Sequence, residues 1–322
     1  MKKFALAIAL LVGPVTVFGL VNHHRSNATS PRATSPVATS PNATSPFAMN
    51  PVAMNHDAIN HDAISHDASG ASEIGQQASP QNSKRPVVVE LFTSEGCSSC
   101  PPADALLARL QDTQPIAGAE IITLSEHVDY WNHLGWRDPY SSAQYTTRQQ
   151  RYAEASGGED NYTPEMFVDG QKGFVGSNEP QARAAITAAT DAPSATVTLS
   201  LEKTTPKPGR PEISLAVRVD NVPEGKGQGP LDVVLAITES GLRSSVKSGE
   251  NHGRTLLHTS VVRKLQSVGS INPRNSRTFS AQPVVRIDSS WTKDHLRAVV
   301  FLQDKSSMRI LGAASLDLSG GQ

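Results

Sequence analysis

The chain of 322 residues has 29 Lys and Arg against 30 Asp and Glu, and its formal net charge is −1. The basic residues are scattered along the chain rather than concentrated in one stretch, which argues against nucleic acid as a partner. The length is sufficient for two ordinary domains.

Residues 1–21 have the pattern of an export signal. Two lysines precede an apolar run from Phe4 to Val21. No clean small-x-small cleavage site follows, and the run is long enough to span a bilayer. We therefore expect a cleaved signal peptide, with an uncleaved inner-membrane anchor as the alternative. In both cases the rest of the chain is expected to be secreted or periplasmic, and only such an anchor would contact a membrane.

Residues 22–84 are expected to form a disordered linker. Short repeats such as "NATSP", "RATSP" and "VATSP" give way to copies of "NHDAI". A composition rich in Ala, Ser, Thr, Pro and Asn buries too little apolar surface to offset the entropy of ordering the chain. His56, His61 and His66 recur every five residues, but a drifting repeat explains them more simply than metal binding does.

Residues 85–192 predict the element order β-α-β-α-β-β-α. The strands are expected at 86–92 and 119–128 and as a hairpin within 165–176, and the helices at 103–112, 140–155 and 177–190. The first two strands are joined through a helix and should be parallel. This is the order of a thioredoxin-like α/β domain.

Residues 193–322 contain at least six short segments that alternate apolar and polar residues, separated by Pro, Gly, Asn and Ser. Such a pattern predicts an all-β, sandwich-like domain. Its polar cluster was expected on the solvated face of the strands, without a chemical role. The members of that cluster are Asn251, His252, Arg254, His258 and Arg263.

The two cysteines of the chain, Cys97 and Cys100, lie in "EGCSSCPP" between the first expected strand and the first expected helix. The helix start favours an anion and would stabilise a Cys97 thiolate, and Cys100 one turn later could resolve a mixed disulfide. In an exported protein the pair can be oxidised. Ser98 and Ser99 supply no charged group, and two following prolines supply no N–H donors.

Two other stretches supply candidate residues around this pair. "NYTPEMF" places Thr163 and Pro164 just before the expected hairpin. In thioredoxin-like folds this position holds a cis-proline packed against the cysteines, and the residue before it offers its main chain to a bound chain, so we expect the same here; the alternative is an ordinary trans X–Pro turn. "EHVDYWNHLGWRDP" follows the second strand, so Glu126, His127 and Trp131 are expected near the strand ends where ligands bind in α/β sheets. The alternative is that Trp131 and Trp136 pack this long loop onto the domain while His127 only caps it.

Four of these stretches together resemble one known family. "VELFTSEGCSSCPPAD", "HVDYWNHLGWRDP", "YTPEMFVDG" and "GFVGS" are similar to the exported thioredoxin-like family known as domain of unknown function 1223. The resemblance implies a thioredoxin-like fold followed by a β-rich segment in a secreted or periplasmic protein. It implies no particular activity.

Three functions remain open from the sequence. The first is thiol–disulfide exchange with exported protein thiols or a redox partner, in which Cys97 and Cys100 act without a further cofactor. The second is metal binding, in which Cys97, Cys100, His127 and His133 hold copper. The third is a non-catalytic binding module with a structural disulfide, although a disulfide that closes so short a loop constrains the unfolded chain little.

Overall fold

The computed structural model describes residues 84–158, 161–202, 211–225 and 229–319. The expected export segment at 1–21 lies outside the described residues, as does all but the last residue of the linker expected at 22–84. No helix among the residues that the structure describes is long and apolar enough to cross a membrane.

The first half of the described chain has the expected order of strands and helices. Its elements are β1 (Arg85–Thr93), α1 (Pro101–Thr113), β2 (Ala119–His127), α2 (Ala143–Ser156), β3 (Glu165–Val168), β4 (Phe174–Val175) and α3 (Glu179–Thr190). β1 and β2 are parallel, and β3 and β4 form an antiparallel pair. The side chain of Ser142 accepts a hydrogen bond from the Gln144 N–H at the start of α2, and the left-handed Gly157 ends this helix.

The second half of the described chain is β-rich, as expected. Its elements are β5 (Thr196–Glu202), β6 (Glu212–Asp220), β7 (Leu231–Glu239), β8 (Leu242–Ser245), β9 (Thr255–His258), β10 (Val261–Ile271), β11 (Phe279–Ala281), β12 (Val284–Arg286), the 3₁₀ helix η1 (Lys293–His295), β13 (Leu296–Asp304) and β14 (Ile310–Asp317).

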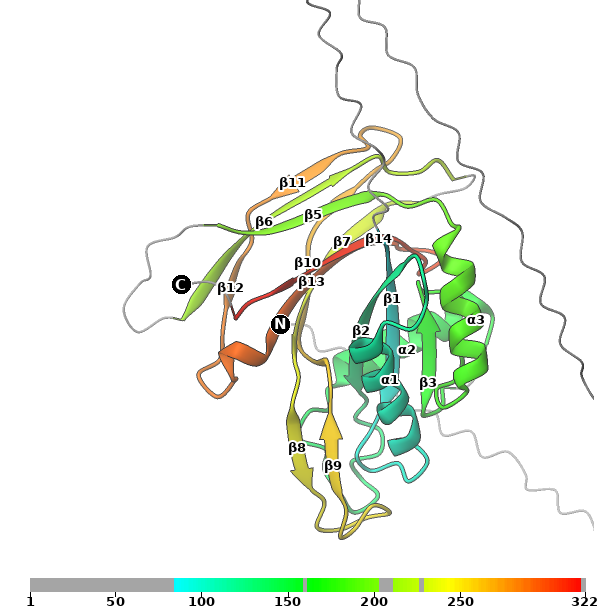
Figure 1. Ribbon diagram of the computed structural model, residues 1–322, viewed down its shortest axis with the longest axis vertical. Coiled ribbons are helices and arrows are strands. Elements are labelled where there is room, and N and C mark those ends of the chain that lie inside the picture. Colours follow the sequence, from blue (N-terminus) through cyan, green and yellow to red (C-terminus); the bar gives the residue numbers. More distant parts are fainter. Residues whose placement is uncertain (1–83, 159–160, 203–210, 226–228, 320–322) are drawn as a thin grey trace, which may run out of the picture. The chain divides into compact units, whose positions relative to one another are not determined.

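These elements do not form the expected pair of domains. A single mixed sheet of eight strands has the order β14-β13-β7-β10-β2-β1-β3-β4, so it contains strands from both halves of the chain (Figure 1). The link between the halves is the parallel pairing of β10 with β2, at Val261 and Ser125. The prediction of a thioredoxin-like domain followed by an all-β sandwich domain is therefore wrong.

The hydrophobic core explains why the two halves share one sheet. One core cluster joins Val88 and Leu124 of the first half to Val234 and Phe301 of the second half. β7 and β13 are buried along almost their whole length, as central strands of a sheet are. Their alternating pattern predicted strands correctly, but such a pattern does not specify which strand lies beside them.

The helices cover both faces of the β1–β2 region. Val87, Val89 and Leu91 of β1 pack with α1 and α3 in one core cluster. The residues between them point to the opposite face, toward α2. Figure 1 shows α1 in front of β1 and β2, with α2 behind them. A second sheet of β5, β6, β11 and β12 packs over the β7 and β13 region.

Candidate functional site

The cysteine loop, which we define as residues 94–100, connects β1 to α1. Cys97 and Cys100 form a disulfide whose Cα atoms lie 5.4 Å apart. Pro101 and Pro102 occupy the first turn of α1 and supply no N–H groups, while the N–H groups of Ala103 and Asp104 donate to the Cys100 carbonyl oxygen. The disulfide thus lies at the start of a 13-residue helix, as the sequence predicted.

The segment before β3 faces this disulfide. The Thr163–Pro164 peptide bond is cis, and the Thr163 carbonyl oxygen lies 3.8 Å from Cys97 Sγ. Trp131 Nε1 donates to Thr163 Oγ1 at 2.8 Å. A Cβ atom on Gly96 would lie 3.0 Å from Trp131 Cβ, so this glycine permits the close approach. Trp131, Thr163 and Pro164 are therefore brought together with the cysteines.

Two other predicted lining residues, Glu126 and His127, point in opposite directions. They are successive residues of β2, paired in register with Phe92 and Thr93 of β1. Strand alternation therefore places His127 on the α1 face beside the cysteine loop and Glu126 on the α2 face. Glu126 lies 3.2 Å from Arg148 Nε as an ion pair without hydrogen-bond geometry, and it does not line the cysteine site.

The alternative metal site receives no support from the arrangement. His133 is exposed on the loop after β2, whereas His127 is buried and bound to Asp138. Within the described ranges, no group of three or more His, Cys, Asp or Glu side chains is arranged to hold a metal ion.

Two buried histidine–carboxylate pairs lie on the α1 face. His127 Nδ1 is 2.7 Å from Asp138 Oδ2, and His258 Nε2 is 2.9 Å from Glu95 Oε1. The two imidazole rings meet edge to face with centroids 5.0 Å apart, and the Tyr140 ring packs against both. Glu95 also accepts a 2.7 Å hydrogen bond from Trp136 Nε1.

The charges within this cluster shift several pKa values. Burial alone would lower the pKa of His127, but the carboxylates of Asp138, Asp104 and Glu95 outweigh burial, and the pKa is raised. Burial alone would raise the pKa of Asp138, but His127 and two backbone N–H donors hold it below its usual value. Burial raises the pKa of Asp104, although both histidines oppose the shift.

The β8–β9 hairpin lies beside α1 (Figure 1), and the loop between its strands contacts the cysteine loop. Asn251 Nδ2, in the loop between β8 and β9, donates to the carbonyl oxygens of Glu95 and Cys97, each at 2.9 Å. The Ser98 N–H donates to Glu250 Oε2 at 3.0 Å, and hydrogen bonding by the Ser98 side chain and by this N–H lowers the pKa of Glu250. Both cysteines are 0% exposed.

Asn251 and His258 correct the expectation that their cluster would lie on a solvated face. They are 0% and 4% exposed. His258 shares the inward face of β9 with Leu256, so alternation within "TLLH" was the available signal. Its partner Glu95 is 163 residues away in the sequence, and no local pattern could identify that contact.

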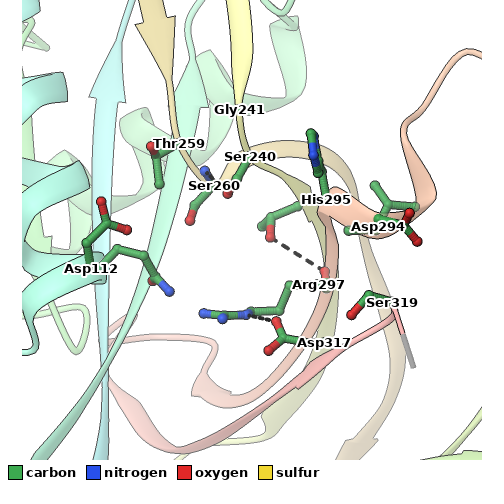
Figure 2. Close-up of a pocket in the computed structure, with 13 residues that line it drawn as sticks. Asp112, Ser240, Gly241, Thr259, Ser260, Asp294, His295, Arg297, Asp317 and Ser319 are labelled. Atoms are coloured by element: carbon green, nitrogen blue, oxygen red, sulfur yellow. Dashed lines mark hydrogen bonds and ion pairs between the residues drawn. The ribbon is translucent and has the colours of Figure 1, made fainter. Parts of the chain in front are cut away.

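A cavity of about 520 Å³ lies elsewhere, where the end of α1 approaches η1 and β14 (Figure 2). Asp112, Asp294 and His295 line it, together with the 2.7 Å ion pair of Arg297 and Asp317. It shares no residue with the cysteine loop, and none of the residues predicted for the site lines it.

Comparisons with known proteins extend over both halves of the described chain. The chain is similar to a protein of Agrobacterium tumefaciens solved by X-ray crystallography, with 27% identity, 74% of this chain and 97% of that chain covered, and a TM-score of 0.53. It also shares its fold with HBP35 of Porphyromonas gingivalis, at 17% identity, with 74% and 77% of the two chains covered and a TM-score of 0.54.

Each of these two structural matches covers 74% of the chain, which is more than either of the two expected domains would occupy. No curated protein matches the sequence. The model of DUF1223, a family described as proteins of unknown function, matches residues 88–303, which include the cysteine loop and the β8–β9 hairpin. The chain therefore belongs to the DUF1223 family.

Proposed function

We propose that this protein is an exported thiol–disulfide oxidoreductase that acts through the Cys97–Cys100 couple. The observation that carries the proposal is the position of Cys97 Sγ, which faces the carbonyl oxygen before cis-Pro164 at 3.8 Å. An extended client chain that lies along Thr163 would have its own cysteine close to Cys97. Trp131 fixes the Thr163 side chain and so helps to hold this segment in place.

The two cysteines would have different roles. Cys97 precedes the helix, and Ser99 Oγ lies 3.3 Å from its sulfur, so a Cys97 thiolate has a hydroxyl donor available. Cys100 is the N-cap residue of α1 and the last residue of the cysteine loop. In the reducing direction, the Cys97 thiolate attacks a client disulfide, and one client sulfur leaves as a thiolate. The Cys100 thiolate then attacks Cys97, which releases the second client thiolate and restores the Cys97–Cys100 disulfide.

The burial of both sulfurs favours a second function. Cys97 and Cys100 are each 0% exposed, so a client reaches them only after the residues around them move; Asn251, which holds the Cys97 carbonyl oxygen, is one of these residues. A disulfide that stays enclosed would serve only to hold the cysteine loop for a binding surface. The reduction potential separates these two functions.

The test equilibrates the full chain with glutathione buffers and measures the reduced fraction by the mass of alkylated cysteines. A potential between about −120 and −270 mV lies in the range of working oxidoreductases and supports the proposal. A potential below about −300 mV marks a resistant structural disulfide and overturns it. Cys100→Ala should also accumulate mixed disulfides at Cys97 with a model disulfide, whereas the matched control Cys97→Ala should accumulate far fewer.

A further inference from the structure

Four buried polar atoms beside the cysteine loop have no hydrogen-bond partner among the described residues. They are His127 Nε2, His258 Nδ1, Asp104 Oδ1 and Thr93 Oγ1. Buried polar atoms are normally paired, because an unpaired one loses its hydration without compensation. Each histidine uses its other ring nitrogen on a carboxylate, so two of the four atoms, His127 Nε2 and His258 Nδ1, are the free ends of organised pairs.

These atoms are contributed by several elements that meet at the disulfide. Asp104 lies one helical turn after Cys100, and its N–H donates to the Cys100 carbonyl oxygen at 3.1 Å. Glu95 lies two residues before Cys97, and Asn251 holds the carbonyl groups of both. The titratable groups of this network are Glu95, Asp104, His127, Asp138, Tyr140 and His258. Three charged residues border the network: Glu250 accepts a hydrogen bond from the Ser98 N–H, Arg254 donates to Asn251, and Arg263 lies over the Tyr140 ring.

The network is short of protons rather than of acceptors. With both histidines neutral and Asp104 ionised, the unpaired atoms of these three residues are all acceptors, and the single Thr93 hydroxyl proton can satisfy only one of them. A single proton on His127 or His258 turns one of these acceptors into a donor. Three buried carboxylates, those of Glu95, Asp104 and Asp138, favour a positive charge at the same place.

We propose that this network is the proton-binding site of the cysteine couple, and that it takes up a proton when the disulfide is reduced. The inference rests on the proposed function. A dithiol reductant delivers two electrons, and its two sulfurs end as a disulfide. One of its protons goes to the Cys100 thiol and the other goes to the network, where it compensates the negative charge of the Cys97 thiolate. The network therefore binds a proton and does not react with the client.

Because of thermodynamic linkage, the effect can be measured either at the histidines or at Cys97. If a Cys97 thiolate raises the pKa of a network histidine, protonation of that histidine lowers the pKa of Cys97 by the same amount. The two unpaired ring nitrogens place this effect at His127 and His258. Exposed histidines of the same chain, His133 and His252, should not respond.

The experiment records nitrogen-15 spectra of the imidazoles in the full chain between pH 5 and 9, in the oxidised protein and after reduction by dithiothreitol. Such spectra distinguish the imidazolium from both neutral tautomers, and single His→Gln variants assign the signals. We expect the pKa of His127 or His258 to be higher in the reduced protein by about one unit, a tenfold change in proton affinity. The signals of His133 and His252 should titrate identically in both states.

The reciprocal measurement follows the thiolate absorbance of the reduced protein near 240 nm. His258→Gln should raise the pKa of Cys97 by about one unit, and the matched control His252→Gln should leave it unchanged. If His258→Gln does not fold, the spectra of the unmodified chain still decide the question. Identical titration, or one unchanging protonation state, of both His127 and His258 in the two redox states would overturn the inference.

The outcome is separable from that of the proposed function. A reduction potential in the working range with no histidine response removes only the proton site. A resistant structural disulfide removes the oxidoreductase itself. Metal analysis of the purified chain tests whether a metal ion, rather than a proton, binds the unpaired atoms. A stoichiometric transition metal bound to these histidines would also overturn the proton assignment.

Discussion

The two faces of the β1–β2 pair carry two buried polar networks of different design. On the α2 face, Arg148 donates to Glu90 at 2.6 and 2.7 Å and to Gln303 at 3.0 Å, and Tyr152 donates to Glu90. On the α1 face, two histidine–carboxylate pairs and Asp104 leave several atoms unpaired. The first network is organised around one permanent cation, and the second around groups that titrate.

The difference indicates different roles. Gln303 lies on β13, so the α2 network joins the two halves of the chain through the permanent charge of Arg148, on the face of β1 and β2 opposite the cysteine loop. The α1 network lies under the cysteine loop and has the capacity to change its charge. A buried network built around a permanent charge suits stability and specificity of the fold, whereas one that titrates beside a redox couple suits chemistry.

The largest effect is expected when the cation of the α2 network is removed. Arg148→Met leaves Glu90 and Glu126 buried without a counter-charge, and we expect the free energy of unfolding to fall by about 3–5 kcal/mol in urea titrations. Arg151→Met, on the exposed side of the same helix, is the matched control and should change stability by less than about 0.5 kcal/mol. Equal effects of the two substitutions would mean that the α2 network does not brace the fold.

The contact between the β8–β9 loop and the cysteine loop can be removed without changing the α2 network. Asn251→Ala leaves the carbonyl oxygens of Glu95 and Cys97 without their buried donor, so the loop around residue 251 should open more often. Loss of about 2 kcal/mol from the closed state would accelerate reduction of the disulfide by dithiothreitol by roughly tenfold or more. The neighbouring exposed His252→Ala is the control. An unchanged rate in Asn251→Ala would show that this clamp does not limit access.

The two carboxylates of the α2 network should not be equivalent. Glu90 accepts three hydrogen bonds from charged and phenolic donors, whereas Glu126 forms none, so Glu90→Gln should cost about 2–3 kcal/mol and Glu126→Gln less than about 1 kcal/mol. Burial raises the pKa of Glu126 well above its usual value; Arg148 opposes this shift, and Glu90 adds to it.

The raised pKa of Glu126 makes the free energy of unfolding depend on pH. Because the folded-state pKa is raised, the folded protein binds this proton more tightly than the unfolded chain, and stability is lost as the pH rises through the folded-state value. Glu126→Gln avoids that loss. Its stability relative to the unmodified protein should therefore increase from pH 5 to pH 8 in urea titrations, and a decrease would contradict the assignment.

The sequence predicted local elements and failed at their assembly. A β-branched run, the helical spacing of Leu106, Leu107 and Leu110, and the turn at Asp169–Gly170 each depend on neighbouring residues, and each element lies where it was expected. The pairing of β10 with β2 depends on two segments about 135 residues apart, at Val261 and Ser125. Hydrophobic alternation determines which face of a strand is buried but not its neighbour, so two domains were predicted where one sheet exists.

The candidate site divides in the same way. Cys97, Cys100 and the Thr163–Pro164 segment were found because a short motif and its place between elements carry the information. Asn251 and His258 were missed because their role depends on a hairpin that folds back over the cysteine loop. Glu126 was expected beside the cysteines because it belongs to the stretch that follows the second strand, but strand alternation places it on the opposite face from His127.

The smallest predicted effect concerns Glu165, which directly follows cis-Pro164 at the edge of the α2 face. Burial raises the pKa of Glu165 to about 6, although a hydrogen bond from Gln149 Nε2 at 2.7 Å opposes the shift. The folded protein therefore loses stability relative to the unfolded chain as the pH rises from about 4.5 to about 6. Glu165→Gln keeps an acceptor for Gln149 and removes the titration, so its free energy of unfolding should rise relative to that of the unmodified protein across this window.

Solvent screening limits this gain in stability to about 1 kcal/mol or less. It is measured by urea titration at several pH values, with the exposed Glu154→Gln as the control. A gain that appears only above pH 7 would place the titrating group elsewhere, and no gain would mean that the Glu165 carboxyl is as well hydrated in the folded protein as in the unfolded chain.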